Sequence, residues 1–156
     1  MIFITDEVKN DPIERWNLPD EVFFAAGACH ILAYAFLQKY ADKNFKAIWI
    51  KPAKGYRGNH IFVTDGNTVF DFEGVSSYET YIEQIEAKLT SIFYQWNYEL
   101  IEIDEHILIS EQESKKIEGL WLRQPDQFLH NALPRANTYL QMFSAEIEKS
   151  MFAHSS

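Results

Sequence analysis

The sequence contains one cysteine, Cys29, and its neighbours indicate what chemistry the thiol can do. It lies in the stretch GACHILAYAFL, where apolar residues recur at helical spacing after a glycine, so a helix is predicted to begin at or near Cys29. Unpaired N–H groups and the positive end of the helix dipole stabilise a thiolate at such a position and attract anions. Cys29 is therefore a candidate nucleophile, and the alternatives are a small buried residue or a metal ligand.

A histidine and an aspartate are predicted to share one face of a β-hairpin. The stretches HIFVT and NTVFDFEG read as strands joined at Asp65-Gly66, a pair typical of a two-residue turn. Counting back from this turn places His60 directly opposite Asp71. A turn centred one residue later leaves them as diagonal neighbours on the same face, because side chains alternate with a period of two.

The pairing of His60 with Asp71 supplies a base that is held in place. A carboxylate beside an imidazole favours the protonated ring and fixes one of its nitrogens, which leaves the other nitrogen free for chemistry. Together with Cys29 these residues form a candidate catalytic triad. The structural alternative is a cross-strand contact that stabilises the hairpin by about 0.2 to 1 kcal/mol.

The loop before the hairpin, PAKGYRGN, is basic and contains two glycines. Its residues Lys54, Tyr56 and Arg57 are candidate contacts for an anionic or carbonyl-rich substrate, and the alternative is a solvent-exposed loop without that role. His30 is also counted among the candidate substrate contacts. It lies about 100° around the helix from Cys29, so we expect it to flank the site or face solvent.

The residue types near the candidate triad would also suit a metal ion. Cys29, His60, Asp71 and Glu73 are all potential ligands, but they lack the short paired spacing of zinc motifs. We therefore expect no metal and no other cofactor.

Further elements are predicted on either side of the hairpin. FKAIWIK and ELIEIDEHILI read as strands. Helices are expected behind two capping boxes, Ser76 with Glu79 and Ser110 with Glu113. The order of helix, strands and helices predicts an α+β fold in which helices back an antiparallel sheet.

The length of 156 residues is typical of a single domain. We expect its core to span about 19–109, followed by a helical C-terminal extension over about 110–156. The last helix carries an apolar stripe formed by Leu140, Phe143, Ile147 and Met151. Packing on the core is the expected role of this stripe, and the alternative is a surface for a protein partner or for a homodimer.

The composition limits location and partners. A net charge of −9 and a pI near 5.0 oppose binding to the phosphate backbone of nucleic acid. No stretch approaches the roughly 20 apolar residues that span a bilayer, and the N-terminus lacks the pattern of a secretory signal. With one cysteine the fold needs no disulfide, so we expect a cytoplasmic protein that binds neither nucleic acid nor membranes.

Three stretches, GACHILAYAFL, NHIFVTDG and NTVFDFEG, together resemble the papain-like thiol superfamily. Their order and spacing are similar to its transglutaminase-like, arylamine acetyltransferase-like and NlpC/P60-like branches, over roughly residues 20 to 75. The resemblance implies a papain-like core in which the Cys29 thiolate attacks an acyl carbon, His60 moves the proton and Asp71 holds His60. It implies an acyl hydrolase or an acyl or amide transferase that acts on a peptide, amide or thioester.

The sequence departs from the papain pattern at the oxyanion hole. Papain-type proteases have a glutamine shortly before the cysteine, and no glutamine precedes Cys29. An oxyanion would depend on the Cys29 backbone N–H and a second donor, for which His30 is a candidate. The alternative function is a non-catalytic interaction module on the same fold, which would bind another protein through the helical C-terminal third.

Overall fold

The chain folds around an antiparallel sheet. The computed structural model describes the backbone of residues 1–154 and the side chains of residues 1–151, and within that part of the chain five strands pair in the order β4-β3-β2-β1-β5. The predicted α+β class is confirmed. The last two residues of the predicted C-terminal extension lie outside the described residues.

The elements follow one another along the chain as helices, then strands, then mainly helices. Their bounds are α1 Asp6–Lys9, α2 Pro12–Trp16, α3 Asp20–Ala25, α4 Cys29–Lys39, β1 Lys46–Pro52, β2 His60–Thr64, β3 Thr68–Asp71, β4 Gly74–Ser77, α5 Tyr78–Ile92, β5 Tyr98–Ile103, the 3-10 helix η1 Glu105–Ile109, α6 Glu111–Ser114, the 3-10 helix η2 Pro125–Gln127, α7 Ala132–Gln141 and α8 Ser144–His154.

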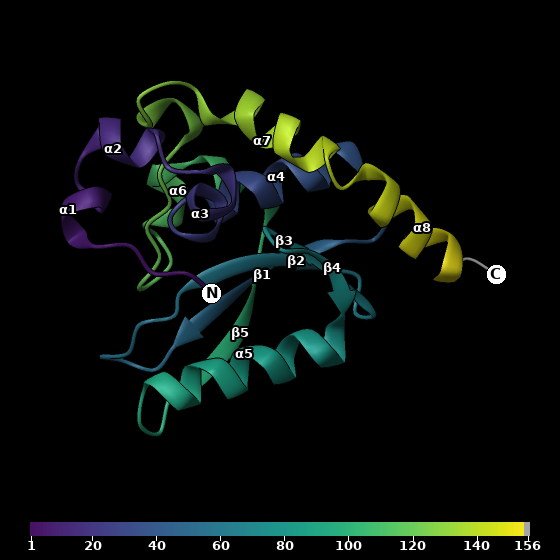
Figure 1. Ribbon diagram of the computed structural model, residues 1–156, viewed down its shortest axis with the longest axis horizontal. Coiled ribbons are helices and arrows are strands. Elements are labelled where there is room, and N and C mark those ends of the chain that lie inside the picture. The colour runs from purple at the N-terminus through teal and green to yellow at the C-terminus, as the bar shows by residue number, and fades with distance from the viewer. Residues whose placement is uncertain (155–156) are drawn as a thin grey trace.

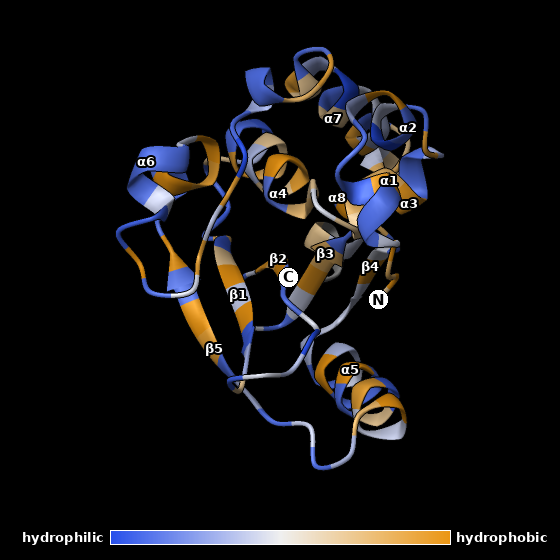
Figure 2. Cartoon of the chain, turned by 90° about the vertical axis from the view of Figure 1, so that its left-hand side faces the viewer, coloured by the Kyte–Doolittle hydropathy of each residue, from blue (hydrophilic) through white to orange (hydrophobic). Residues whose placement is uncertain are grey.

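Helices cover both faces of the sheet (Figure 1). On one face α4 packs on β1, β2 and β3, with α7 against α4, and on the other face α5 packs on β3 and β4. Figure 2 shows α5 with hydrophobic and hydrophilic residues side by side around the helix, as expected of a helix with one face on the sheet. All five residues of β2 are buried because this strand lies between the two helical layers.

The strand β2 therefore contributes to two apolar clusters. Ile61 and Val63 belong to the larger core on the α4 side. Phe62, between them in the chain, belongs to a smaller core on the α5 side together with Tyr81. This alternation is the period of two that strand geometry requires, with both faces buried. His60 and Asp71 thus lie inside the protein.

The β2–β3 hairpin has the diagonal register. Val63 pairs with Phe70, and continuing this register places Asp71 opposite Phe62 rather than opposite His60. The direct pairing predicted from a two-residue turn is therefore wrong. The loop still contains an even number of residues, so His60 and Asp71 remain on the same face.

The side chain of Asp65 explains the longer loop. Its Oδ1 accepts hydrogen bonds from the backbone N–H of Asn67 at 2.9 Å and of Thr68 at 2.8 Å. The hydroxyl of Thr64 donates to the Thr68 carbonyl at 2.7 Å. These bonds close a four-residue turn in which Gly66 has a φ of +98°, a value that favours glycine.

Two boundaries differ from those predicted. The residue that caps α5 is Ser77, whose hydroxyl accepts from the Thr80 N–H at 3.2 Å, whereas Ser76 still pairs with Val69 in β4. The predicted strand ELIEIDEHILI ends at Ile103, and a 3-10 helix follows it. Two apolar residues of that helix face the core, since Leu108 is fully buried and Ile107 packs against the larger cluster.

The C-terminal helices complete the core on the α4 side. Leu140 and Ile147 are 1% and 2% exposed and belong to the larger cluster, with Phe143 and Met151 packed against it. The predicted packing of these residues on the core is confirmed, but they do not lie on a single helix: Leu140 belongs to α7, Ile147 and Met151 belong to α8, and Phe143 lies between the two helices. None of the helices in the described range combines the length and apolar character of a bilayer-spanning segment.

Candidate active site

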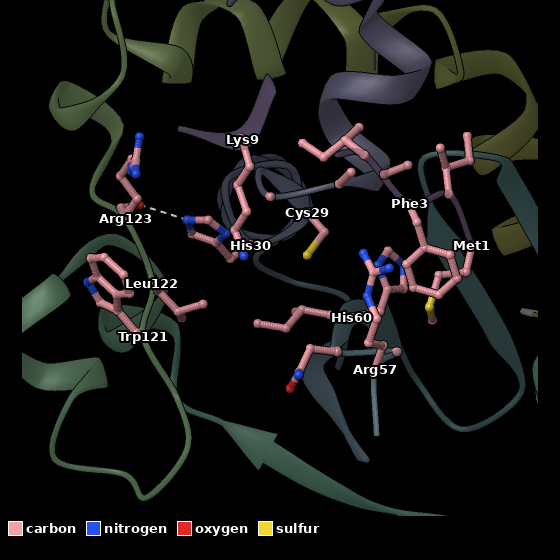
Figure 3. A pocket seen from close by; sticks show the side chains of 18 of the residues that line it. Met1, Phe3, Lys9, Cys29, His30, Arg57, His60, Trp121, Leu122 and Arg123 are labelled. Carbon is pink, nitrogen blue, oxygen red and sulfur yellow. Dashed lines mark hydrogen bonds between the residues drawn. The ribbon is translucent and has the colours of Figure 1, made fainter. Parts of the chain in front are cut away.

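The thiol of Cys29 lies at the first residue of α4, as predicted. The short connection from α3 passes through Gly27, whose φ of +109° turns the chain, and Ala28 occupies the N-cap position without a side-chain acceptor. The N–H groups of the first turn therefore have no cap from the residue before Cys29. The side chain is partly exposed and extends into a cavity of about 490 Å³ (Figure 3).

His60 lines the same cavity and is held by Asp71. Its Nε2 lies 3.2 Å from Asp71 Oδ2, and both side chains are buried. The other ring nitrogen, Nδ1, is also buried and has no hydrogen-bond partner among the described residues. A buried ring nitrogen without a partner is costly. In Figure 3 the Cys29 side chain reaches into the space between the rings of His60 and His30.

Asp71 is fixed by three donors. In addition to His60, the Tyr81 hydroxyl donates to Oδ2 at 2.8 Å and the Glu73 backbone N–H donates to Oδ1 at 2.9 Å. Burial disfavours the carboxylate, but these hydrogen bonds and the charge of His60 hold the pKa of Asp71 below its usual value. Asp71 is therefore a buried anion with a fixed orientation.

The electrostatics favour a thiolate–imidazolium pair. Burial disfavours the Cys29 thiolate, but the neighbouring His30 and His60 rings stabilise the anion and lower the pKa of Cys29 to about 5. Burial also disfavours the His60 imidazolium, yet Asp71 and Cys29 raise its pKa to about 9. Between these two values the sulfur carries a negative charge and the ring a positive one.

His30 flanks the site, one of the two positions expected for it, and it is buried rather than facing solvent. It is 3% exposed, and its Nε2 lies 2.7 Å from the carbonyl oxygen of Arg123. Because a carbonyl only accepts, Nε2 donates this bond. The loop containing Arg123 lies against the start of α4 (Figure 3). This loop covers His30, which would be exposed if the helix stood alone.

The predicted basic loop contributes two of its three candidate residues to the cavity. Tyr56 and Arg57 line it, whereas the side chain of Lys54 is exposed and does not. The Tyr56 hydroxyl donates to the Tyr94 carbonyl at 2.7 Å, and the Arg57 guanidinium lies 4.5 Å from the centre of the Phe3 ring. Both side chains are therefore positioned by contacts with other segments.

The sequence interpretation missed several residues of the site. Tyr81 was recognisable only as part of an apolar helix stripe, although a buried tyrosine usually has a hydrogen-bond partner. Arg15, Trp121 and Arg123 also line the cavity, and they come from segments to which no site was assigned. Arg15 is 5% exposed, and a buried arginine has no local sequence signal.

Ligand types for a metal are present but are not gathered together. Within the described part of the chain no group of three or more histidine, cysteine, aspartate or glutamate side chains could hold a metal ion. Glu73, one of the potential ligands, contributes its backbone N–H to Asp71 instead.

Comparison of the chain with known proteins found no matching family model, no matching curated protein and no matching solved structure. The interpretation of the site therefore depends on its own geometry and chemistry.

Proposed function

We propose that this protein is a cysteine-dependent acyl hydrolase or acyl or amide transferase with a papain-like arrangement of Cys29, His60 and Asp71. The observation that carries the proposal is the imidazole of His60, which Asp71 holds through Nε2 while its buried Nδ1 has no hydrogen-bond partner among the described residues, in a cavity that Cys29 also lines. This is the order of nucleophile, base and orienting group that thiol acyl transfer uses.

The first half-reaction follows from the charges. The Cys29 thiolate attacks the carbonyl carbon of an amide or thioester, and a carbon–sulfur bond forms. Negative charge develops on the carbonyl oxygen, where the uncapped N–H groups at the start of α4 are available as donors. The bond to the leaving group breaks as His60 gives it a proton, which leaves an acyl thioester and a neutral imidazole.

The second half-reaction restores the starting state. Water or an amine attacks the thioester, and neutral His60 takes its proton through Nδ1. The carbon–sulfur bond breaks, the acid or amide leaves, and the thiolate–imidazolium pair forms again. Asp71 keeps its charge throughout and holds the ring in the orientation that both proton transfers need.

Acylation by p-nitrophenyl acetate tests this proposal. We expect a burst of nitrophenolate stoichiometric with the chain, an acetyl group on Cys29 by mass spectrometry, and loss of that group to water or an added amine. Cys29→Ala should give no burst, and His60→Ala should give a slow one. Acetylation no faster than that of N-acetylcysteine at the same thiolate concentration would instead support the non-catalytic interaction module.

A further inference from the structure

Arg15 is a buried cation that no carboxylate of the described residues pairs with. Its side chain lines the cavity and is 5% exposed, and its Nη2 and Nη1 donate to the carbonyls of Gly27 at 3.1 Å and Lys9 at 3.4 Å. Nε is buried and has no acceptor in the described part of the chain. No carboxylate of the described side chains lies within 4.0 Å of this guanidinium. Buried charges are normally paired with an opposite charge, so the Arg15 guanidinium lacks the anion that its burial calls for.

A second guanidinium lies near the same aromatic ring as the first. The Cζ atoms of Arg15 and Arg123 are 5.3 Å and 5.6 Å from the centre of the same Phe128 ring. Burial and the repulsion from Arg123 lower the pKa of Arg15 to about 10, against the attraction of the Cys29 sulfur. Like the first, the Arg123 guanidinium has no carboxylate within 4.0 Å among the described side chains. Both arginines line the cavity that Cys29 also lines, and neither is paired with a carboxylate of the described side chains.

The charge of the cavity is opposite to the charge of the molecule. The chain has 23 acidic and 14 basic residues, yet the cavity is lined by one acidic residue, Asp6, and by four basic ones. The basic residues are Lys9, Arg15, Arg57 and Arg123. If charged residues were distributed evenly over the protein, the cavity would contain more acidic than basic residues. The excess of basic residues therefore favours the binding of an anion.

We propose that Arg15 and Arg123 bind an anionic group, a carboxylate or a phosphate, of the acyl substrate and so hold its acyl carbon at Cys29. This inference rests on the proposed acyl transfer at the same site. Guanidinium groups bind carboxylates and phosphates through pairs of parallel hydrogen bonds, which fix orientation as well as affinity. The free Nε of Arg15 and the exposed part of Arg123 supply donors for such a group.

Two alkylating reagents test the anion site without knowledge of the substrate. Iodoacetate and iodoacetamide bring the same carbon and leaving group to Cys29 but differ in that one carries a carboxylate. The measured quantity is the ratio of their rate constants at low ionic strength, where charges are least screened. We expect this ratio to exceed that of N-acetylcysteine by about tenfold, because the cavity attracts the anion.

Matched variants assign the effect to the arginines. Arg123→Gln, at a half-buried position, should lower the iodoacetate rate about tenfold and leave the iodoacetamide rate nearly unchanged. Lys54→Gln removes the same charge from an exposed position outside the cavity and should leave the ratio unchanged. A wild-type ratio no higher than that of N-acetylcysteine, or an equal response to both variants, would overturn the proposal.

Protection experiments separate the two anions. Inorganic phosphate or acetate is added before iodoacetamide, and the slowing of Cys29 alkylation is measured. Slower alkylation in the wild type, but not in Arg123→Gln, supports the site. The anion that slows alkylation more identifies the group that the site binds. Protection by neither anion overturns it. The test of the anion site and the test of the proposed function can fail separately. An ordinary pKa for Cys29 refutes the activated nucleophile, even if the preference for iodoacetate persists. A reactive Cys29 without that preference refutes only the anion site.

Discussion

Tyr81 and His60 bind the same oxygen of one carboxylate. The phenolic oxygen of Tyr81 lies 2.8 Å from Asp71 Oδ2, and the Nε2 atom of His60 lies 3.2 Å from it. Tyr81 comes from α5 and His60 from β2, so Asp71 joins the helix on one face of the sheet to the strand of the candidate base. The orientation of the candidate base therefore depends on the packing of α5.

Tyr81→Phe removes this hydroxyl while keeping the ring that packs against Phe62 at 4.7 Å between centroids. We expect the free energy of unfolding to fall by about 1 to 3 kcal/mol, because a buried carboxylate loses a donor. Iodoacetamide labelling of Cys29 should slow several-fold, because Asp71 holds His60 less firmly. Urea denaturation and labelling rates measure the two effects.

A second buried tyrosine provides the control for that change. The Tyr139 hydroxyl donates to the Phe72 carbonyl at 2.6 Å, which is a hydrogen bond outside the Cys29–His60–Asp71 arrangement. Tyr139→Phe should lower stability by about 1 kcal/mol without slowing the labelling of Cys29. Equal labelling rates in the two variants would show that Tyr81 is only a structural residue.

Asp71→Asn tests whether the carboxylate sets the charge of the candidate base. Without the anion at 3.2 Å the pKa of His60 falls, and a neutral ring no longer stabilises the thiolate, so the pKa of Cys29 rises. At pH 6.5 we expect iodoacetamide labelling to slow by about tenfold or more. A labelling curve identical to that of the wild type would mean that His60 keeps its proton without Asp71.

The part of the site that depends on local geometry could be predicted from the sequence. Cys29 begins its helix because a glycine and a run of apolar residues mark that boundary, and His60 shares a face with Asp71 because the turn contains an even number of residues. The exact register was not accessible, since it depends on the hydrogen bonds that Asp65 makes within the loop.

The surroundings of the triad could not be predicted because they come from distant segments. His30 looks exposed on a helix considered alone, and only the loop around Arg123 buries it. Arg15 lies in a short helix near the N-terminus, and no periodic pattern distinguishes a buried arginine from a solvated one. The positive cavity is thus a property of the tertiary structure.

The pH dependence of labelling measures the thiolate directly. The Cys29 pKa is lowered to about 5, so the labelling rate should rise as the pH rises through about 5 and then remain level through neutral pH. His60→Ala should move this midpoint toward the value of about 8.5 for a free thiol. Acyl transfer needs the protonated ring as well, so it should decline as the pH rises through about 9. A wild-type midpoint near that of a free thiol contradicts the ion pair.

Gly27→Ala tests the link between Arg15 and the start of α4. A Cβ on Gly27 would lie 1.9 Å from Arg15 Nη2, and its φ of +109° is itself strained for alanine. We expect the free energy of unfolding to fall by about 3 kcal/mol or more. Gly55→Ala is the matched control, since Gly55 has a φ of +91° and no described atom lies within 4 Å of an added Cβ, so it should lose only about 1 kcal/mol for the backbone strain. Equal losses in urea denaturation would show that Arg15 moves aside freely, and the guanidinium would then not be held in place beside Cys29.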